Sequence, residues 1–98
     1  MASSQSDVYA FGIMLWEIAT SRVPYEDVSG DKARYIRGGG RPKTTGLSSD
    51  KAALVPIMTA SWDASPARRP TMAKILQMLQ VLLISLAIPA VDFHSSFL

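Results

Sequence analysis

The residues that could carry acid–base chemistry are eight carboxylates and one histidine, His94. Asp7 and Glu17 lie ten residues apart in one predicted helix, a separation of about 15 Å along its axis. A carboxylate pair that cleaves glycosidic bonds works at a shorter separation. No local pattern places a nucleophile or an orienting carboxylate beside His94, and no Gly-x-Ser-x-Gly turn occurs. The spacing therefore predicts no catalytic residue and favours a solvated histidine.

The spacing of potential ligand residues along the sequence does not indicate a metal or phosphate site either. The chain has no cysteine, and no group of His, Asp or Glu shows metal-ligand spacing. The run Gly38–Gly40 could suggest a phosphate loop, but such a loop requires a preceding strand and a Lys-Ser/Thr pair before a helix. No strand pattern precedes this run, and no predicted helix follows it directly. We predict no metal-binding or cofactor-binding residue and interpret the glycines as a helix stop followed by a loop.

Composition suits a small globular domain or part of a larger one. The 98 residues are 48% hydrophobic and carry a formal net charge of +2. The basic side chains around the glycine run form only a loose patch: Arg34, Arg37, Arg41 and Lys43. Nucleic-acid binding requires a denser stripe, so no nucleic-acid partner is predicted. The lack of cysteine and of an apolar leader after Met1 is typical of a cytoplasmic protein.

The element that must organise these residues is a predicted helix over residues 6–20. Ser6 is placed to cap it, Asp7 complements the positive end of its dipole, and it should end near Thr20. Between residues 8 and 19 nearly every side chain is apolar, which predicts burial on all sides. The run is too short to span a membrane. Ninety-eight residues are barely enough to wrap such a helix.

Two further helices are predicted before residue 63. The first covers residues 32–37, is capped by Ser29 or Asp31, and ends at the glycine run. The second covers residues 50–62 and is capped by Ser48 or Ser49. Pro56 should kink this second helix or delay its start.

A turn and a fourth helix are predicted for the rest of the chain. Ser65 as cap and Pro66 at the first helical position favour a short helical turn. Thr71 should cap the last helix, which Pro89 ends. One broad face of that helix is apolar: Met72, Ile75, Leu76, Leu79, Leu82, Leu83 and Leu86. Because no strand pattern occurs, the predicted fold class is all-α.

Residues 81–88 are apolar on every side of the last helix. Gln77 and Gln80 interrupt the tract, so it is too short and too broken to span a membrane, and association with a membrane stays an alternative. Residues 92–98 show no periodicity.

Two charged residues need partners or solvent. Asp7 opens an otherwise apolar helix, and Arg69 lies between two turns beside Pro70. In one interpretation Asp7 only caps its helix and Arg69 is solvated. In the other, each has a partner elsewhere, because buried charges persist only when they are paired or hydrogen-bonded.

Three segments in the right order resemble the protein-kinase catalytic domain. Residues 6–18, Ser-Asp-Val-Tyr-Ala-Phe-Gly-Ile-Met-Leu-Trp-Glu-Ile, closely resemble helix αF, the central helix of the C-lobe, and residues 22–25 look like the segment after it. Residues 36–42 are similar to the link after αG. Residues 61–72 resemble the αH–αI signature Cys-Trp-x-x-Asp-Pro-x-x-Arg-Pro-Thr-Phe, with Ser61 for Cys and Ser65 for Asp. The style of these motifs points to the tyrosine-kinase or tyrosine-kinase-like branch.

The resemblance implies roles for individual residues. Asp7 resembles the αF aspartate that hydrogen-bonds the catalytic-loop backbone, and Arg69 resembles the arginine that pairs with the Glu of Ala-Pro-Glu. Glu17 matches a position that faces the bound peptide in some members. The structural family positions are Asp7, Trp16, Trp62, Pro66, Arg69 and Pro70.

The family's catalytic motifs are missing from these 98 residues. Nothing resembles the Gly-rich loop, the strand-borne Lys, the αC Glu, or the His-Arg-Asp, Asp-Phe-Gly and Ala-Pro-Glu segments. The resemblance therefore predicts a truncated kinase domain over residues 6–80 with an extension over 81–98. The family uses ATP and Mg²⁺ to phosphorylate Ser/Thr or Tyr in proteins, but this piece should bind neither and be inactive alone. A protein-interaction piece, with a protein substrate or a missing kinase half as partner, is the alternative.

Overall fold

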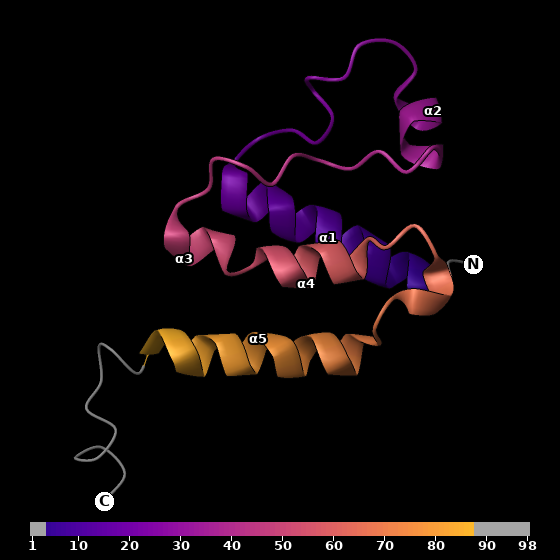
Figure 1. The fold of residues 1–98 in the computed structure, drawn as a ribbon. Helices are drawn as coiled ribbons and strands as arrows, with labels where there is room; N and C mark the ends of the chain where they lie inside the picture. The colour runs from indigo at the N-terminus through magenta and orange to yellow at the C-terminus, as the bar shows by residue number, and fades with distance from the viewer. Residues whose placement is uncertain (1–3, 88–98) are drawn as a thin grey trace, which may run out of the picture.

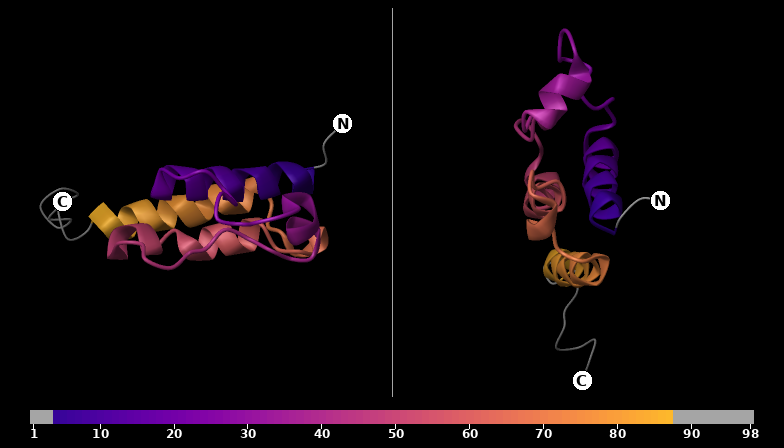
Figure 2. Two further views of the ribbon diagram at one scale, coloured as in Figure 1. Left: turned by 90° about the horizontal axis from the view of Figure 1, so that it is seen from above. Right: turned by 90° about the vertical axis from the view of Figure 1, so that its right-hand side faces the viewer.

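The computed structural model describes residues 4–87, with side chains described through Ser85. Within that range the chain is helical and contains no strand, which confirms the predicted all-α fold class. Its elements are α1 (Ser4–Thr20), α2 (Lys32–Arg37), α3 (Ser49–Ala52), α4 (Val55–Ser61), the 3₁₀ turn η1 (Pro66–Arg68) and α5 (Met72–Ala87). Helices α1, α4 and α5 lie side by side, while α2 stands apart at the end of a long loop (Figures 1 and 2).

The closest helix packing is between α1 and α4. A Cβ atom built on Gly12 of α1 would lie 2.8 Å from the Cβ of Ser61 and 3.2 Å from the carbonyl oxygen of Met58. Glycine is therefore required for the two helices to approach this closely. Ser61 is fully buried, and its hydroxyl donates a 2.7 Å hydrogen bond to the carbonyl of Ile57.

The core is assembled mainly from these two helices. Its buried members are Val8, Leu15, Trp16, Ala19, Ile57, Met58, Trp62 and Ile75. Ile75 is the contribution of α5 and is completely buried. The core thus lies along one side of α1 and is closed at one edge by the first half of α5.

The other side of α1 is open. Met14 is 47% exposed and Ile18 is 67% exposed, so the helix is not buried on every side as its composition predicted. The described chain covers one side of α1 with α4 and the loops, and it has no element on the other. Helix α1 also begins at Ser4, two residues earlier than predicted, so Ser6 is not its cap, whereas Asp7 does lie in the first turn.

Helix α2 forms as predicted. The Asp31 carboxylate accepts a hydrogen bond from the backbone N–H of Arg34 at 3.1 Å, which is the capping contact. The N–H of Gly38 donates to the carbonyl of Arg34 and ends the helix. Gly40 then passes directly against the ring of Tyr35, where any side chain would collide.

The predicted helix over residues 50–62 is two helices instead. Helix α3 ends at Ala52 and α4 starts at Val55, with Pro56 in its first turn, so proline delays the start of a helix. Ser48 occupies the cap position of α3, but its hydroxyl donates to the Asp50 carboxylate at 2.7 Å. That hydrogen bond lowers the pKa of Asp50.

Helix α5 is capped by Thr71, whose hydroxyl accepts from the N–H of Lys74 at 3.1 Å, as predicted. Its predicted broad apolar face is only partly buried. Ile75 is buried and Leu79 and Leu82 are half-buried, but Leu76 and Leu83 are more than half exposed. The side chain of Leu86 and the predicted stop at Pro89 lie outside the described residues.

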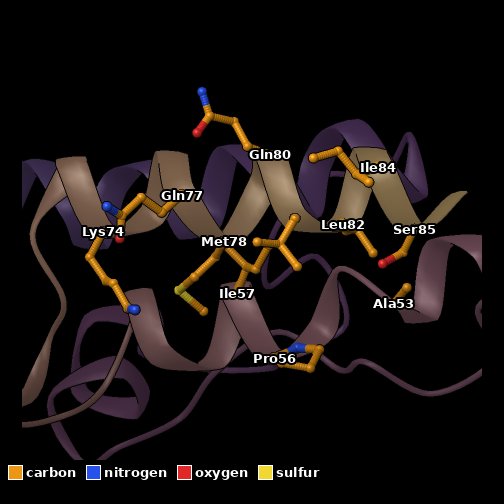
Figure 3. A pocket seen from close by; sticks show the side chains of 11 residues that line it. Ala53, Pro56, Ile57, Lys74, Gln77, Met78, Gln80, Leu82, Ile84 and Ser85 are labelled. Carbon is orange, nitrogen blue, oxygen red and sulfur yellow. The ribbon is translucent and has the colours of Figure 1, made fainter. Parts of the chain in front are cut away.

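A groove of about 630 Å³ separates the outer half of α5 from α4. Met78 and Leu82 point from α5 toward α4, while Gln80 and Ile84 point away from it (Figure 3). Between residues 4 and 87, no helix combines the length and hydropathy needed to cross a bilayer.

Candidate functional site

Two arginines converge on one tyrosine of α1. The guanidinium carbon of Arg41 lies 5.1 Å from the centre of the Tyr9 ring, and that of Arg69 lies 5.0 Å from it. Both distances are within the range of cation–π attraction. Arg41 follows the glycine run and Arg69 follows η1, so this contact joins segments from three parts of the chain.

Arg41 ties the end of α2 to the end of α4. Its Nε donates to the carbonyl of Trp62 at 2.7 Å. Its Nη1 donates to the carbonyls of Ile36 at 3.2 Å and Gly40 at 2.7 Å. The guanidinium thus joins carbonyl oxygens from the end of α2 and the segment after it with one from the end of α4.

Arg69 joins the turn before η1 to the start of α1. Its Nε donates to the carbonyl of Asp63 at 2.9 Å, and its Nη1 donates to the carbonyl of Gln5 at 3.0 Å. The side chain is half-buried, so the interpretation of a merely solvated Arg69 is wrong. Its partners among the described residues are backbone carbonyls and the Tyr9 ring. The ion pair that the resemblance implies for Arg69 stays a prediction.

Tyr9 also belongs to a cluster of three tyrosines. Its hydroxyl lies 3.3 Å from the hydroxyl of Tyr25, and the ring of Tyr25 meets that of Tyr35 edge-on at 6.1 Å. Burial, reinforced by the hydrogen bond with Tyr9, raises the pKa of Tyr25. Tyr25 has a φ angle of +63°, an unfavourable backbone conformation for a residue with a side chain, which this packing holds in place.

Asp7 lies two residues before Tyr9 and therefore on a different face of α1. Its side chain is exposed, and no hydrogen bond or ion pair joins its carboxylate to another described residue. Met14 and Ile18 follow at the seven- and eleven-residue spacing that places all three on one face of α1. Glu17 is exposed beside this face. Asp7 therefore stands on the open side of α1, apart from Arg69.

The remaining predicted family positions build the scaffold. Trp16 and Trp62 are each 4% exposed, and the indole N–H of Trp16 donates to the carbonyl of Lys43 at 2.8 Å. Pro66 begins η1, and Pro70 is half-buried between η1 and α5.

Arg41 is the functional position that sequence reasoning missed, because it was assigned to a loose basic patch. Its role depends on carbonyls that lie up to 21 residues away. Chemically, this arrangement holds the backbone in place, since Nε and Nη1 of both guanidinium groups donate to backbone carbonyls. Within the described residues, no three His, Cys, Asp or Glu side chains are placed to hold a metal ion.

The sequence pattern of the family described as protein tyrosine and serine/threonine kinase matches residues 1–79. The chain belongs to this kinase family. It is 34% identical over 95 residues to mitogen-activated protein kinase kinase kinase 10 of Xenopus laevis, covering 95% of this chain and 10% of the relative. It is 42% identical over 84 residues to tyrosine-protein kinase receptor torso of Bombyx mori, covering 83% and 10%.

Vascular endothelial growth factor receptor 3 of Danio rerio is 32% identical over 97 residues, covering 96% of this chain and 7% of the relative. The chain thus spans about a tenth or less of the length of these relatives. Proteins named as tyrosine kinases and as kinases of the mitogen-activated cascade are both similar to it.

Proposed function

We propose that residues 6–80 are the helical base of a kinase C-lobe and supply its scaffold rather than its reacting groups. In this assignment α1 corresponds to αF, α2 to αG, α4 to αH and α5 to αI. The order of the helices and the family match over residues 1–79 support it. Residues 81–98 extend beyond that base.

The observation that carries the proposal is the division of α1 into two sides. On one side Gly12 packs against α4. At the start of the helix, Arg69 binds the carbonyl of Gln5 and the ring of Tyr9. On the other side Asp7 faces solvent beside exposed Met14 and Ile18. An αF aspartate in the family binds the catalytic loop, so the open side is where the remainder of a lobe would pack.

The reaction of the parent family is ATP-dependent phosphorylation of Ser/Thr or Tyr in a protein substrate. ATP and Mg²⁺ are held in that family by the Gly-rich loop, the strand-borne Lys and the Asp-Phe-Gly segment, and these 98 residues contain none of them. We therefore expect the 98-residue chain by itself to transfer no phosphate.

A phosphorylation assay with the purified chain tests this expectation. Radiolabelled ATP with Mg²⁺ is supplied with myelin basic protein and with a Glu-Tyr copolymer, and no incorporation above a blank is expected. Circular dichroism confirms that the assayed chain is helical. Incorporation that disappears in the Asp7→Asn variant would overturn the proposal, whereas incorporation unaffected by that variant identifies a contaminating kinase.

A non-catalytic interaction role is the second candidate, because the open side of α1 is apolar. Met14 and Ile18 would be covered if a kinase segment ending in Ala-Pro-Glu bound in trans. Co-expression of the chain with that segment of a relative should give a complex, which the Ile18→Glu variant should abolish. Val23→Glu is the matched control, since Val23 is 62% exposed but lies beyond the end of α1. Equal loss in both variants, or no complex, would count against this role.

A further inference from the structure

A basic hollow lies at the C-terminal end of α1, away from the arginine–tyrosine cluster. Its volume is about 380 Å³, and residues 43–48 of the loop that leads to α3 form its second wall. In Figure 1 this loop passes beside the C-terminal end of α1. The basic side chains that line it are Arg22, Lys43 and Lys51, and no carboxylate lines it. We propose that this hollow binds a phosphate dianion, either free or carried by a phosphorylated side chain. The proposal does not depend on the kinase assignment.

Two of the three cations are paired on the outer rim. The Nε of Arg22 lies 3.0 Å from the Glu26 carboxylate, and the Nζ of Lys43 lies 3.3 Å from the Asp27 carboxylate. All four of these side chains are at least 42% exposed. Exposed pairs of this kind contribute little to stability, so a dianion can compete with the two carboxylates. Lys51 forms no ion pair within 4 Å among the described residues, although its charge acts on the neighbouring Asp50 carboxylate.

Hydroxyl groups and a fixed backbone complete the hollow. Thr45 and Ser48 line it beside Gly46, whose φ angle of +80° fixes the bend of the loop. The indole of Trp16 forms part of the wall, and its hydrogen bond to the carbonyl of Lys43 holds the loop against α1. The Ser48 hydroxyl donates to the Asp50 carboxylate, so of the two hydroxyls only that of Thr45 is offered to a phosphate oxygen, while the other oxygens face the cations.

The end of α1 sets the strength of binding. Its last carbonyls carry partial negative charge and oppose an anion, so weak binding is expected, with a dissociation constant on the order of 1 mM. The paired carboxylates oppose it as well. Removing Glu26 or Asp27 should therefore strengthen binding, whereas removing Lys51 should weaken it. A site that merely stabilised the loop would not give variants of opposite sign.

Nuclear magnetic resonance of the full chain tests the proposal, with the indole N–H of Trp16 as reporter. Inorganic phosphate and phenyl phosphate are titrated at constant ionic strength, with chloride as the reference anion. Sucrose keeps the chain folded if it is marginally stable. A saturable shift is expected that weakens at least threefold in Lys51→Met and strengthens about twofold in Asp27→Asn. The matched control is Lys74→Met, a lysine on α5 outside the hollow.

The two phosphate sources are separated by their affinities. Tighter binding of phenyl phosphate than of inorganic phosphate identifies a phosphorylated side chain, because the ring would contact Leu47 and Trp16. Equal binding identifies free phosphate. A shift reproduced by chloride, or one that Lys51→Met and Asp27→Asn leave unchanged, would overturn the proposal.

Discussion

Both sides of α1 carry large apolar side chains, but their surroundings are very different. The covered side packs Val8, Leu15, Trp16 and Ala19 into the core, with Gly12 against Ser61. The open side presents Met14 and Ile18 to solvent beside Asp7. The difference teaches that a helix with apolar residues on all sides needs neighbouring elements on all sides to bury them. Within the described residues, α1 is covered on one side only.

Truncating one methionine buried against the covered side of α1 and one exposed on its open side should give the largest contrast. Met58 of α4 is completely buried against α1, and truncation by Met58→Ala should cost about 2–5 kcal/mol. Met14→Ala on the open side should change stability by about 0.5 kcal/mol or less. Urea denaturation followed by circular dichroism measures both. Equal losses would show that the two sides do not differ.

A side chain added at position 12 should force α1 and α4 apart. In Gly12→Val the added carbon atoms meet the Cβ of Ser61 and the carbonyl of Met58, so a loss of about 1–3 kcal/mol is expected. Ala10→Val, at an exposed position of the same helix, should cost about 0.7 kcal/mol or less. Adding Ser61→Gly to Gly12→Val should restore part of the loss. If the double variant recovers no stability, the strain does not arise from the contact with Ser61.

Arg41 tests whether backbone carbonyls hold the covered side together. Arg41→Lys keeps the charge but loses the three carbonyl hydrogen bonds of the guanidinium group, so a loss of about 1–2 kcal/mol is expected. Arg37→Lys is the control, because Arg37 is exposed at the end of α2. The midpoints of urea denaturation of the two variants are compared. Indistinguishable midpoints would remove Arg41 from the scaffold.

The smallest effect is expected from alkaline pH. Because the pKa of Tyr25 is raised above its ordinary value of 10.0, the folded chain keeps a proton that the unfolded chain loses. The free energy of unfolding should therefore fall as the pH rises above about 10. The slope should be shallower in Tyr25→Phe than in Tyr35→Phe, measured by urea denaturation between pH 9 and 11. Identical slopes would contradict the buried tyrosine cluster.

Much of the local structure could be predicted from the sequence because it depends on neighbouring residues. Asp31 and Thr71 cap their helices within three residues of the N–H groups that they bind. The approach of Gly12 to Ser61 and the contacts of Arg41 could not be predicted, since each depends on a segment 20 or more residues away. Gly12 is the instructive case. A glycine inside an apolar helix indicates a close neighbour, but it does not identify that neighbour.

The candidate site, too, could be predicted from the sequence only in part. Its residues Asp7 and Arg69 were singled out because charged groups in apolar surroundings require partners. The structure supplies partners for Arg69 and leaves Asp7 in solvent. The family roles of both residues rest on contacts with segments that these 98 residues do not contain.

The most direct test of the two-sided α1 is solvent access to methyl groups. A soluble gadolinium reagent broadens the resonances of methyls that reach water, and Met14 and Ile18 have close counterparts in Met58 and Ile57. Strong broadening of Met14 and Ile18 is expected while Met58 and Ile57 stay sharp. Equal broadening of both pairs, or protection of Met14 and Ile18, would contradict the account.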